Sequence, residues 1–252
     1  MEYIRAIVAT PHPYDSAPLI QWMLRHIEVP IFAVGIYLWF IFSVGPKIKN
    51  PIPCRPLFAL WNLFLATFSI LGATYTVPSL AKTISNHGLL GSFCHDPLET
   101  FYQTDAGYWV ALFILSKIPE LIDTVFLVIQ KKPVIFLHWY HHVTVCLYCW
   151  HTYTHYVHAI MYSYYFFMAV NLKMLVKPLA PLITSLQILQ MVFGVVITTV
   201  VLLVQDDDEP SKCATVGSNA RLGWVMYFSY LILFGQLFVN SYLRKKPKTK
   251  SA

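Results

Sequence analysis

The chain alternates long apolar blocks with short polar segments. A transmembrane helix needs about 20 apolar residues to cross about 30 Å of hydrocarbon, and most of the blocks reach this length. They cover residues 27–45, 57–78, 108–129, 134–150, 156–176, 179–204 and 222–243. The pattern predicts an all-α polytopic membrane protein, built as a seven-helix transmembrane bundle.

Composition supports this fold class. Of the 252 residues, 57% are hydrophobic and only 12% are charged, whereas about a quarter of the residues in a soluble globular domain are charged. We therefore exclude a soluble domain, and expect membrane lipid but no nucleic acid among its partners. No internal repeat or second domain interrupts the blocks, so the chemistry must lie within the bundle or at its faces.

The charges between the blocks alternate along the chain. Basic segments hold Lys47, Lys49 and Arg55, then Lys131 and Lys132, then Lys173 and Lys177, and finally the tail. The intervening loops are acidic or uncharged, and basic loops stay in the cytosol. We therefore expect a lumenal segment over residues 1–26, a membrane domain over 27–243 and a cytosolic basic tail over 244–252. No signal-peptide pattern precedes the first block, so we expect it to insert without cleavage.

The basic tail also contains a candidate localisation signal. Lys248 and Lys250 stand five and three residues from the end of the chain, a spacing that resembles the dilysine signal for return to the endoplasmic reticulum. A basic run can also simply hold a helix against anionic lipid. We favour the signal, and so predict a protein of the endoplasmic reticulum membrane.

Three histidines, His138, His141 and His142, lie near the start of the fourth block. Steps of three and four place their imidazoles within a sector of about 100° on a helix, so that they face one way. Burying three imidazoles on one face of a membrane helix is costly and hard to explain as packing. They predict a functional site.

Two chemistries suit this box: metal ligation, as in membrane di-iron oxygenases, and acid–base or nucleophilic attack on an acyl group. A di-iron site needs more ligands than the spans supply, and no second histidine-rich box is present. The remaining candidates are His151, His155, His158, Glu120 and Asp123. We therefore favour imidazole chemistry without a metal.

The third block carries Lys117, Glu120, Asp123 and Thr124 close to one helix stripe. A charge in mid-membrane is costly unless it is paired, so Lys117 should pair with Glu120 or Asp123. Pro119 removes one helix hydrogen bond and should kink the helix. The set is either an ion pair that docks helices or a wall that orients the histidines and polar substrate atoms.

Polar stripes continue in the next two blocks. His158, Tyr162 and Tyr165 share a face of the fifth block, and Gln187 and Gln190 share a face of the sixth. Such residues often only hydrogen-bond neighbouring helices. Polar stripes in four successive blocks favour a shared polar chamber inside an apolar tube.

The five cysteines fall into two groups of interest. Cys94 and Cys213 lie in loops expected in the lumen, and the sequence leaves open a disulfide between them or two free thiols. Cys146 and Cys149 follow the box on the same helix face, and a thiol beside an imidazole is a conventional acyl acceptor. We interpret these two as core thiols.

Taken in order, the motifs resemble the very long chain fatty acid elongase family, over about residues 55–250. The resemblance rests on Arg55-Pro-Leu, Trp61-Asn62, Phe68-Ser-Ile-Leu-Gly72, Lys117 to Thr124, the histidine box, His158 to Tyr165, Thr184 to Gln190 and the basic tail. His138 followed by Trp139-Tyr140 resembles the branch that acts on saturated and monounsaturated chains.

The resemblance implies a condensing enzyme, a 3-oxoacyl-CoA synthase with no metal or cofactor. Acyl-CoA and malonyl-CoA would give 3-oxoacyl-CoA, CoA and carbon dioxide, with the reductases and dehydratase of the cycle as partners and a homodimer left open. An apolar tube suits the substrate, since each buried methylene contributes about 0.8 kcal/mol.

The resemblance also implies roles for the site residues. His141 would take the acyl group, with His138, His142 and His158 as base, proton carrier or stabiliser of the enolate. The polar stripes would bind the substrate through Lys117, Glu120, Asp123, Thr124, Tyr162, Tyr165, Gln187 and Gln190. CoA phosphates would meet Lys131, Lys132, Lys173 and Lys177 at the cytosolic mouth.

One spacing departs from the family pattern. Only fifteen residues separate His142 from His158, and Thr154 stands where the family has Asn. At about 1.5 Å per residue, His141 and His158 would then lie at different depths in the membrane. We therefore predict a shortened fourth and fifth helix pair and weak or absent elongation. A lipid-binding relative without turnover stays open as an alternative, and a seven-span receptor is a more distant one.

Overall fold

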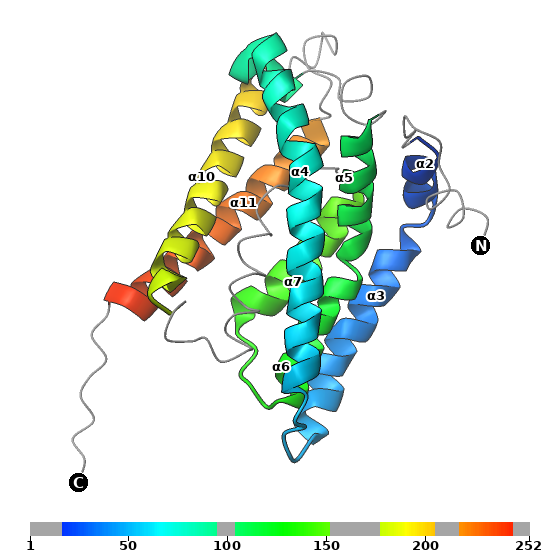
Figure 1. Cartoon of the computed structure of the whole chain (residues 1–252), viewed down its shortest axis with the longest axis vertical. Coiled ribbons are helices and arrows are strands. Elements are labelled where there is room, and N and C mark those ends of the chain that lie inside the picture. Colours follow the sequence, from blue (N-terminus) through cyan, green and yellow to red (C-terminus); the bar gives the residue numbers. More distant parts are fainter. Residues whose placement is uncertain (1–16, 95–103, 152–176, 205–216, 244–252) are drawn as a thin grey trace.

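Helices make up all the regular structure of the described residues. The computed structural model describes residues 17–94, 104–151, 177–204 and 217–243. Its helices are α2 (Ala17–Arg25), α3 (Glu28–Trp39), α4 (Arg55–Cys94), α5 (Asp105–Ser116), α6 (Ile122–Ile129), α7 (Phe136–His151), α10 (Ala180–Val204) and α11 (Gly217–Phe238) (Figure 1). Turns of π-helix (Phe40–Val44) and 3-10 helix (Gly45–Lys47) extend α3, a 3-10 turn (Lys177–Leu179) precedes α10, and a π-helix (Val239–Leu243) extends α11.

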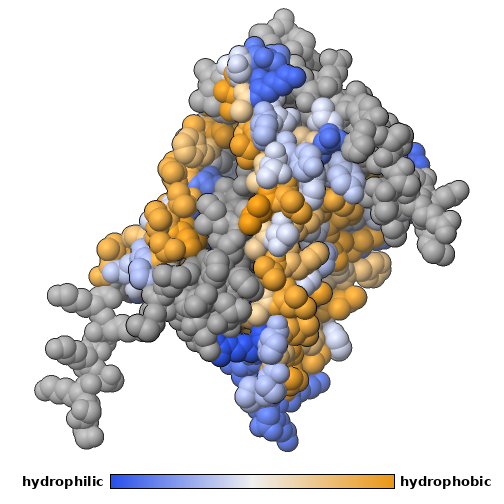
Figure 2. All heavy atoms as spheres, viewed as in Figure 1, coloured by the Kyte–Doolittle hydropathy of each residue, from blue (hydrophilic) through white to orange (hydrophobic). Residues whose placement is uncertain are grey.

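Four helical segments of the described residues are long and apolar enough to cross a membrane. They are Glu28–Lys47, Arg55–Gly88, Ala180–Val204 and Gly217–Leu243. Large apolar side chains such as Phe32, Phe64 and Phe193 point outward from them. Figure 2 shows apolar side chains across the middle of the bundle and hydrophilic ones toward its two ends. The chain is therefore an all-α polytopic membrane protein, as predicted.

The third and fourth predicted spans are shorter or less regular than these four segments. The third is divided into α5 and α6 by a 3-10 turn, Pro119–Leu121, so the α-helix is interrupted at the predicted proline. The fourth is α7, whose 16 residues span about 24 Å. The fifth predicted span, and with it the depth of His158, lies outside the described residues.

Helix α4 is longer than the sequence pattern predicts. Residues 79–94 were expected in a lumenal loop, but the helix continues through them, past Pro78. Its direction changes at Gly88, where φ is +70°, a backbone conformation that glycine adopts without a Cβ clash. The far end of α4 then reaches the other helix ends, because Cys94 packs against Val201 of α10 and Ala220 of α11.

Two of the predicted basic loops meet at one end of the bundle. The N–H of Ile52 donates to the carbonyl of Ile129 at 2.8 Å, and the Lys131 ammonium donates to the carbonyl of Gly45 at 3.3 Å. The loops after α3 and after α6 therefore share one side, as the alternation of charges predicts.

Helix α2 was not predicted from the sequence. Leu19 and Met23 lie four positions apart and enter the same core cluster as Trp150 of α7. The indole N–H of Trp150 also donates to the carbonyl of Met23 at 2.8 Å. Helix α2 thus packs against the C-terminal end of α7.

Helices α10 and α11 form the most extensive helix pair of the described residues. A Cβ built on Gly194 would lie 2.6 Å from the ring of Tyr227, so only glycine lets the two backbones approach this closely. Small residues serve this purpose in membrane helix pairs.

Candidate functional site

The three histidines of α7 form a row of adjacent rings. The ring centroids of His138 and His142 are 4.6 Å apart, and those of His141 and His142 are 5.7 Å apart. The four-residue spacing brings the rings of His138 and His142 together, because such positions are neighbours on a helix surface, and His141 directly precedes His142 in the sequence. A small acyl group could therefore meet more than one imidazole.

One edge of the row faces α3 and α6. The Nε2 atom of His138 lies 2.9 Å from the hydroxyl of Thr124, which lies 2.8 Å from the hydroxyl of Tyr37. The ring of Tyr37 is also 6.2 Å from the ring of His142. Tyr37 was not singled out from the sequence, since nothing in an apolar helix marks one tyrosine as the neighbour of a distant histidine.

The other edge of the row faces α11. The ring of His141 lies 5.3 Å from the ring of Tyr230, which is almost fully buried. The Tyr230 hydroxyl hydrogen-bonds the hydroxyl of Thr144 and lies 3.5 Å from the carbonyl of His141. Nearby, the hydroxyls of Tyr140 and Ser229 are 3.0 Å apart. These contacts fix α7 against α11 beside His141.

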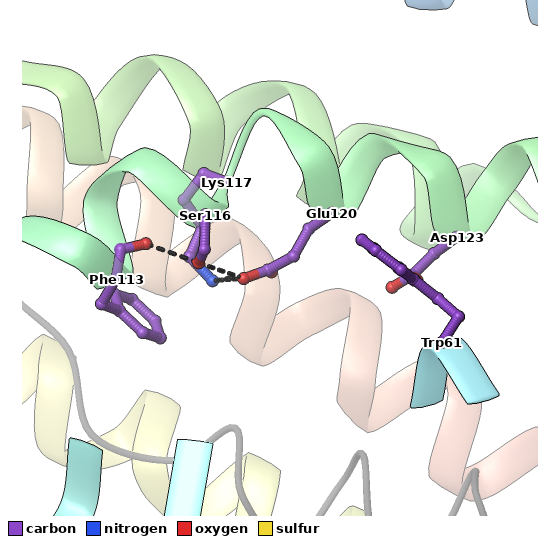
Figure 3. Close-up of polar contacts among 6 residues, drawn as sticks. All are labelled: Trp61, Phe113, Ser116, Lys117, Glu120 and Asp123. Carbon is purple, nitrogen blue, oxygen red and sulfur yellow. Dashed lines mark hydrogen bonds and ion pairs between the residues drawn. The ribbon is translucent and has the colours of Figure 1, made fainter. Parts of the chain in front are cut away.

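The predicted ion pair of Lys117 is present, with Glu120 as its partner. The ammonium lies 2.6 and 2.7 Å from the two carboxylate oxygens, and both side chains are at most 6% exposed. Ser116 donates to the same carboxylate at 2.6 Å, and the ammonium sits 3.7 Å from the centroid of the Phe113 ring. Figure 3 shows the Lys117 and Ser116 side chains converging on Glu120. The charges of Lys117 and Glu120 are therefore paired with each other and with neighbouring groups of the protein.

Asp123 takes a different partner. The indole N–H of Trp61 donates to its carboxylate at 2.6 Å, which joins α4 to α6 (Figure 3). The sequence marked Trp61 as part of a motif but gave it no role. Only a pattern of paired change among relatives could have linked two residues 62 positions apart.

The remaining predicted site residues are placed less centrally. Lys131 and Lys132 are exposed at the end of α6, where Lys132 lies over the Phe58 ring. Gln187 and Gln190 are half-buried on α10. Predictions for His158, Tyr162, Tyr165 and Lys173 lie outside the described residues, and the side chain of Lys177 is likewise not described.

The cysteines separate into bonded and free thiols. Cys94 is disulfide-bonded, so the alternative of a free thiol there is wrong; Cys213, the partner that the sequence left open, lies outside the described residues. Cys146 and Cys149 are free and buried, and Cys149 lies in the core cluster with Tyr230. This agrees with core thiols. In the described ranges, no three His, Cys, Asp or Glu side chains are grouped to hold a metal ion.

Comparison with known proteins decides the family. A family model described as ELO, the GNS1/SUR4 family, matches residues 22–250. The chain belongs to this family. The expectation of an elongase-like protein is therefore confirmed at the level of the family, and the match extends further toward the N-terminus than the resemblance had indicated.

Several relatives are similar over most of their length. The chain is 43% identical to "Fatty acid elongase 3" of Trypanosoma cruzi (strain CL Brener), over 88% of this chain and 87% of the relative. It is 39% identical to "Fatty acid elongase 2" of Trypanosoma brucei brucei (strain 927/4 GUTat10.1), over 95% and 97%. It is 40% identical to "Very long chain fatty acid elongase 4" of Trypanosoma cruzi, over 88% and 82%.

One of the alignments includes positions at which this chain has no residue. That with "Fatty acid elongase 3" of Trypanosoma brucei brucei extends over 273 positions, more than the 252 residues of the chain. Some residues of this relative therefore have no counterpart here.

Proposed function

We propose that this protein is the condensing enzyme of fatty acid elongation, which joins a long-chain acyl-CoA to malonyl-CoA. The observation that carries the proposal is the row of three imidazoles on α7, within an apolar bundle of the ELO family. A row of this kind can hold an acyl carbonyl between a nucleophile and proton carriers. The apolar helices around it suit a long acyl chain.

The chemistry divides into two steps. An imidazole nitrogen of His141 attacks the thioester carbonyl, the carbon–sulfur bond breaks, and the thiolate takes up a proton as CoA leaves. Malonyl-CoA then loses carbon dioxide, and the enolate carbon attacks the acyl-imidazole carbonyl. The carbon–nitrogen bond breaks, the leaving nitrogen of His141 takes up a proton, and 3-oxoacyl-CoA is released. The proton that His141 loses in the first step goes to the CoA thiolate, so the two steps together consume one proton from solvent and need no cofactor.

Neighbouring groups assist each step. His142 lies between the other two rings and is the proton carrier for both, while His138 stabilises the enolate oxygen. Lys117, Glu120 and Asp123 act through structure, since their charges are engaged with one another or with Trp61. The proposed polar chamber is completed by His158, Tyr162, Tyr165, Gln187 and Gln190.

The membrane orientation follows from charge and redox state. The end with Lys131 and Lys132 faces the cytosol, where CoA phosphates would also meet Lys173 and Lys177. The opposite end carries the bonded Cys94, and disulfides persist in the lumen of the endoplasmic reticulum. Residues 1–26 are lumenal, the membrane domain spans 27–243, and the tail 244–252 is cytosolic with its retrieval signal. The reductases and dehydratase of the cycle act next on the product.

A second candidate function is lipid or acyl-CoA binding without turnover. The shortened chain favours it, because missing residues between the box and His158 would place the two histidines at different depths. The two candidates differ in whether 3-oxoacyl-CoA forms.

An assay in microsomes separates them. Membranes that carry the full chain receive palmitoyl-CoA and labelled malonyl-CoA, with and without a chelator. We expect labelled 3-oxoacyl-CoA in both samples, loss of product in His141→Ala, and retention in His26→Ala, whose imidazole bonds Glu28 at the α2–α3 junction. Loss of product with the chelator would overturn the metal-free reaction. If this chain forms no product under conditions in which "Fatty acid elongase 3" of Trypanosoma cruzi does, the second candidate is favoured.

A further inference from the structure

A chain of hydrogen bonds leads from α3 through α6 to His138. It joins the hydroxyl of Tyr37, the hydroxyl of Thr124 and Nε2 of His138, over distances of 2.8 and 2.9 Å. Thr124 is 0% exposed and Tyr37 is 4% exposed. Water is thus kept from the two hydroxyls, and the protein must satisfy their protons.

The hydroxyl of Thr124 has unusual partners for a threonine in this protein. Thr67, Thr76, Thr144, Thr184 and Thr198 all donate to the carbonyl four residues earlier. Thr124 makes no such bond in the described structure, because the carbonyl four residues before it belongs to the 3-10 turn at Pro119. Its proton is left for Tyr37 or for His138.

The number of protons available determines which group donates in each of these hydrogen bonds. In the described part of the protein, the Tyr37 hydroxyl has Thr124 as its hydrogen-bond partner. If Thr124 donated to Tyr37, the buried Tyr37 proton would have no acceptor, at a cost of about 1–3 kcal/mol. If both neighbours donated to Thr124, the Thr124 proton would have none. Among the described residues, one arrangement satisfies every proton: Tyr37 donates to Thr124, and Thr124 donates to Nε2 of His138.

The geometry points to Thr124 as a positioning residue, held by Tyr37, that fixes His138 in the tautomer with its proton on Nδ1. The lone pair of Nε2 is then engaged inside the protein, and Nδ1–H is the donor. This inference rests on the proposed function for its meaning: of the roles open to His138, it selects donation to a developing oxyanion. The nucleophile is then another imidazole of the row, in agreement with His141.

Tyr37 should influence the tautomer of His138 less than Thr124 does. Its donated hydrogen bond holds the Thr124 hydroxyl in place, while Thr124 itself contacts the imidazole. Removing the tyrosine hydroxyl therefore loosens Thr124, whereas removing the threonine hydroxyl deletes the donor to Nε2. The two variants should rank in that order in any measurement that reports on His138.

Nitrogen NMR of the histidine tautomers tests the inference without needing activity. The full chain, labelled with ¹⁵N-histidine in lipid nanodiscs, is compared with Thr124→Val, Thr124→Ser and Tyr37→Phe, and the His138 signals are assigned with His138→Gln. We expect a protonated Nδ1 and an unprotonated, hydrogen-bonded Nε2 in the natural chain. The Nε2–H tautomer should appear in Thr124→Val, to a smaller degree in Tyr37→Phe, and not in Thr124→Ser. Tyr140→Phe, which removes a phenol hydroxyl bonded to Ser229, is the matched control and should leave the tautomer unchanged.

Elongation kinetics add a second readout. Thr124→Val should lower kcat by about tenfold or more with KM for acyl-CoA unchanged, because the tautomer affects chemistry and not binding. Thr124→Ser should restore kcat. A protonated Nε2 in the natural chain, or an unchanged tautomer in Thr124→Val, would overturn the inference. If the natural chain shows the expected tautomer but forms no product, the proposed function fails and the tautomer assignment stands.

Discussion

The polar stripe of α5 and α6 and the histidine row of α7 differ in how their groups are satisfied. Lys117 and Glu120 bond each other, and Asp123 bonds Trp61, so the charges of the stripe are engaged within the protein. In the row, rings pack on rings, and no hydrogen bond reaches the imidazole of His142 from the described residues. Buried polar groups are normally paired. On this contrast we propose that the stripe stabilises the structure and that the row carries the chemistry.

The largest effect should come from the row. We expect His141→Ala to lower elongation by about a thousandfold, because it removes the nucleophile from the acyl transfer. Thermal unfolding in detergent should change little, which shows that the loss is chemical. Activity within tenfold of the natural chain would move the nucleophile to another residue and weaken the contrast with the stripe.

The stripe should respond through stability instead. Lys117→Met leaves the buried Glu120 carboxylate without its cation and should cost about 3–5 kcal/mol of unfolding free energy. The double variant Lys117→Met/Glu120→Gln should recover most of this, since the glutamine can still accept the hydrogen bond of Ser116. Denaturant titration in mixed micelles measures both. If Lys117→Met is as stable as the natural chain but inactive, Lys117 acts on substrate and the contrast is wrong.

The bond from Trp61 to Asp123 should contribute less. Trp61→Phe keeps most of the ring packing but removes the donor, at an expected cost of about 1.5–3 kcal/mol for a hydrogen bond to a charged group. Trp109→Phe is the matched control, because among the described residues its ring packs against other rings and makes no hydrogen bond. Equal losses in the two variants would show that ring size, and not the hydrogen bond, is what matters.

The smallest effect concerns the shortened segment after the row. Turnover of this chain should be about a tenth or less of that of the Trypanosoma cruzi "Fatty acid elongase 3" under the same conditions, about 1.4 kcal/mol in barrier. Replacing the segment between His142 and His158 by the corresponding segment of that relative should raise it. Equal rates for the two natural proteins would show that the short spacing does not matter.

The sequence predicts well what depends on local pattern. The helical membrane fold and the adjacency of His138, His141 and His142 follow from hydrophobic blocks or from helix periodicity. The interruption of the third span at Pro119 and the pairing of Lys117 follow from the residue types at those positions. The meeting of the two basic loops follows from the positive-inside rule.

What the sequence does not predict depends on contacts between distant segments. Tyr37 lies 87 positions from Thr124 and Trp61 lies 62 from Asp123, and no periodicity relates such pairs. The continuation of α4 through Pro78 was missed because polar residues after a proline are also typical of a loop. Helix α2 was missed because its nine residues are too few to form one of the long apolar blocks from which the helices were predicted.

The release of CoA in the absence of malonyl-CoA tests the central claim most directly. Purified protein in nanodiscs is mixed with palmitoyl-CoA alone, and free thiol is followed over the first turnover. We expect a burst of about one CoA per chain, since acyl transfer to the enzyme precedes condensation. The burst should be lost in His141→Ala and retained in Cys149→Ala. No burst from the natural chain, or a burst that survives in His141→Ala, would contradict an acyl-imidazole formed on the histidine row.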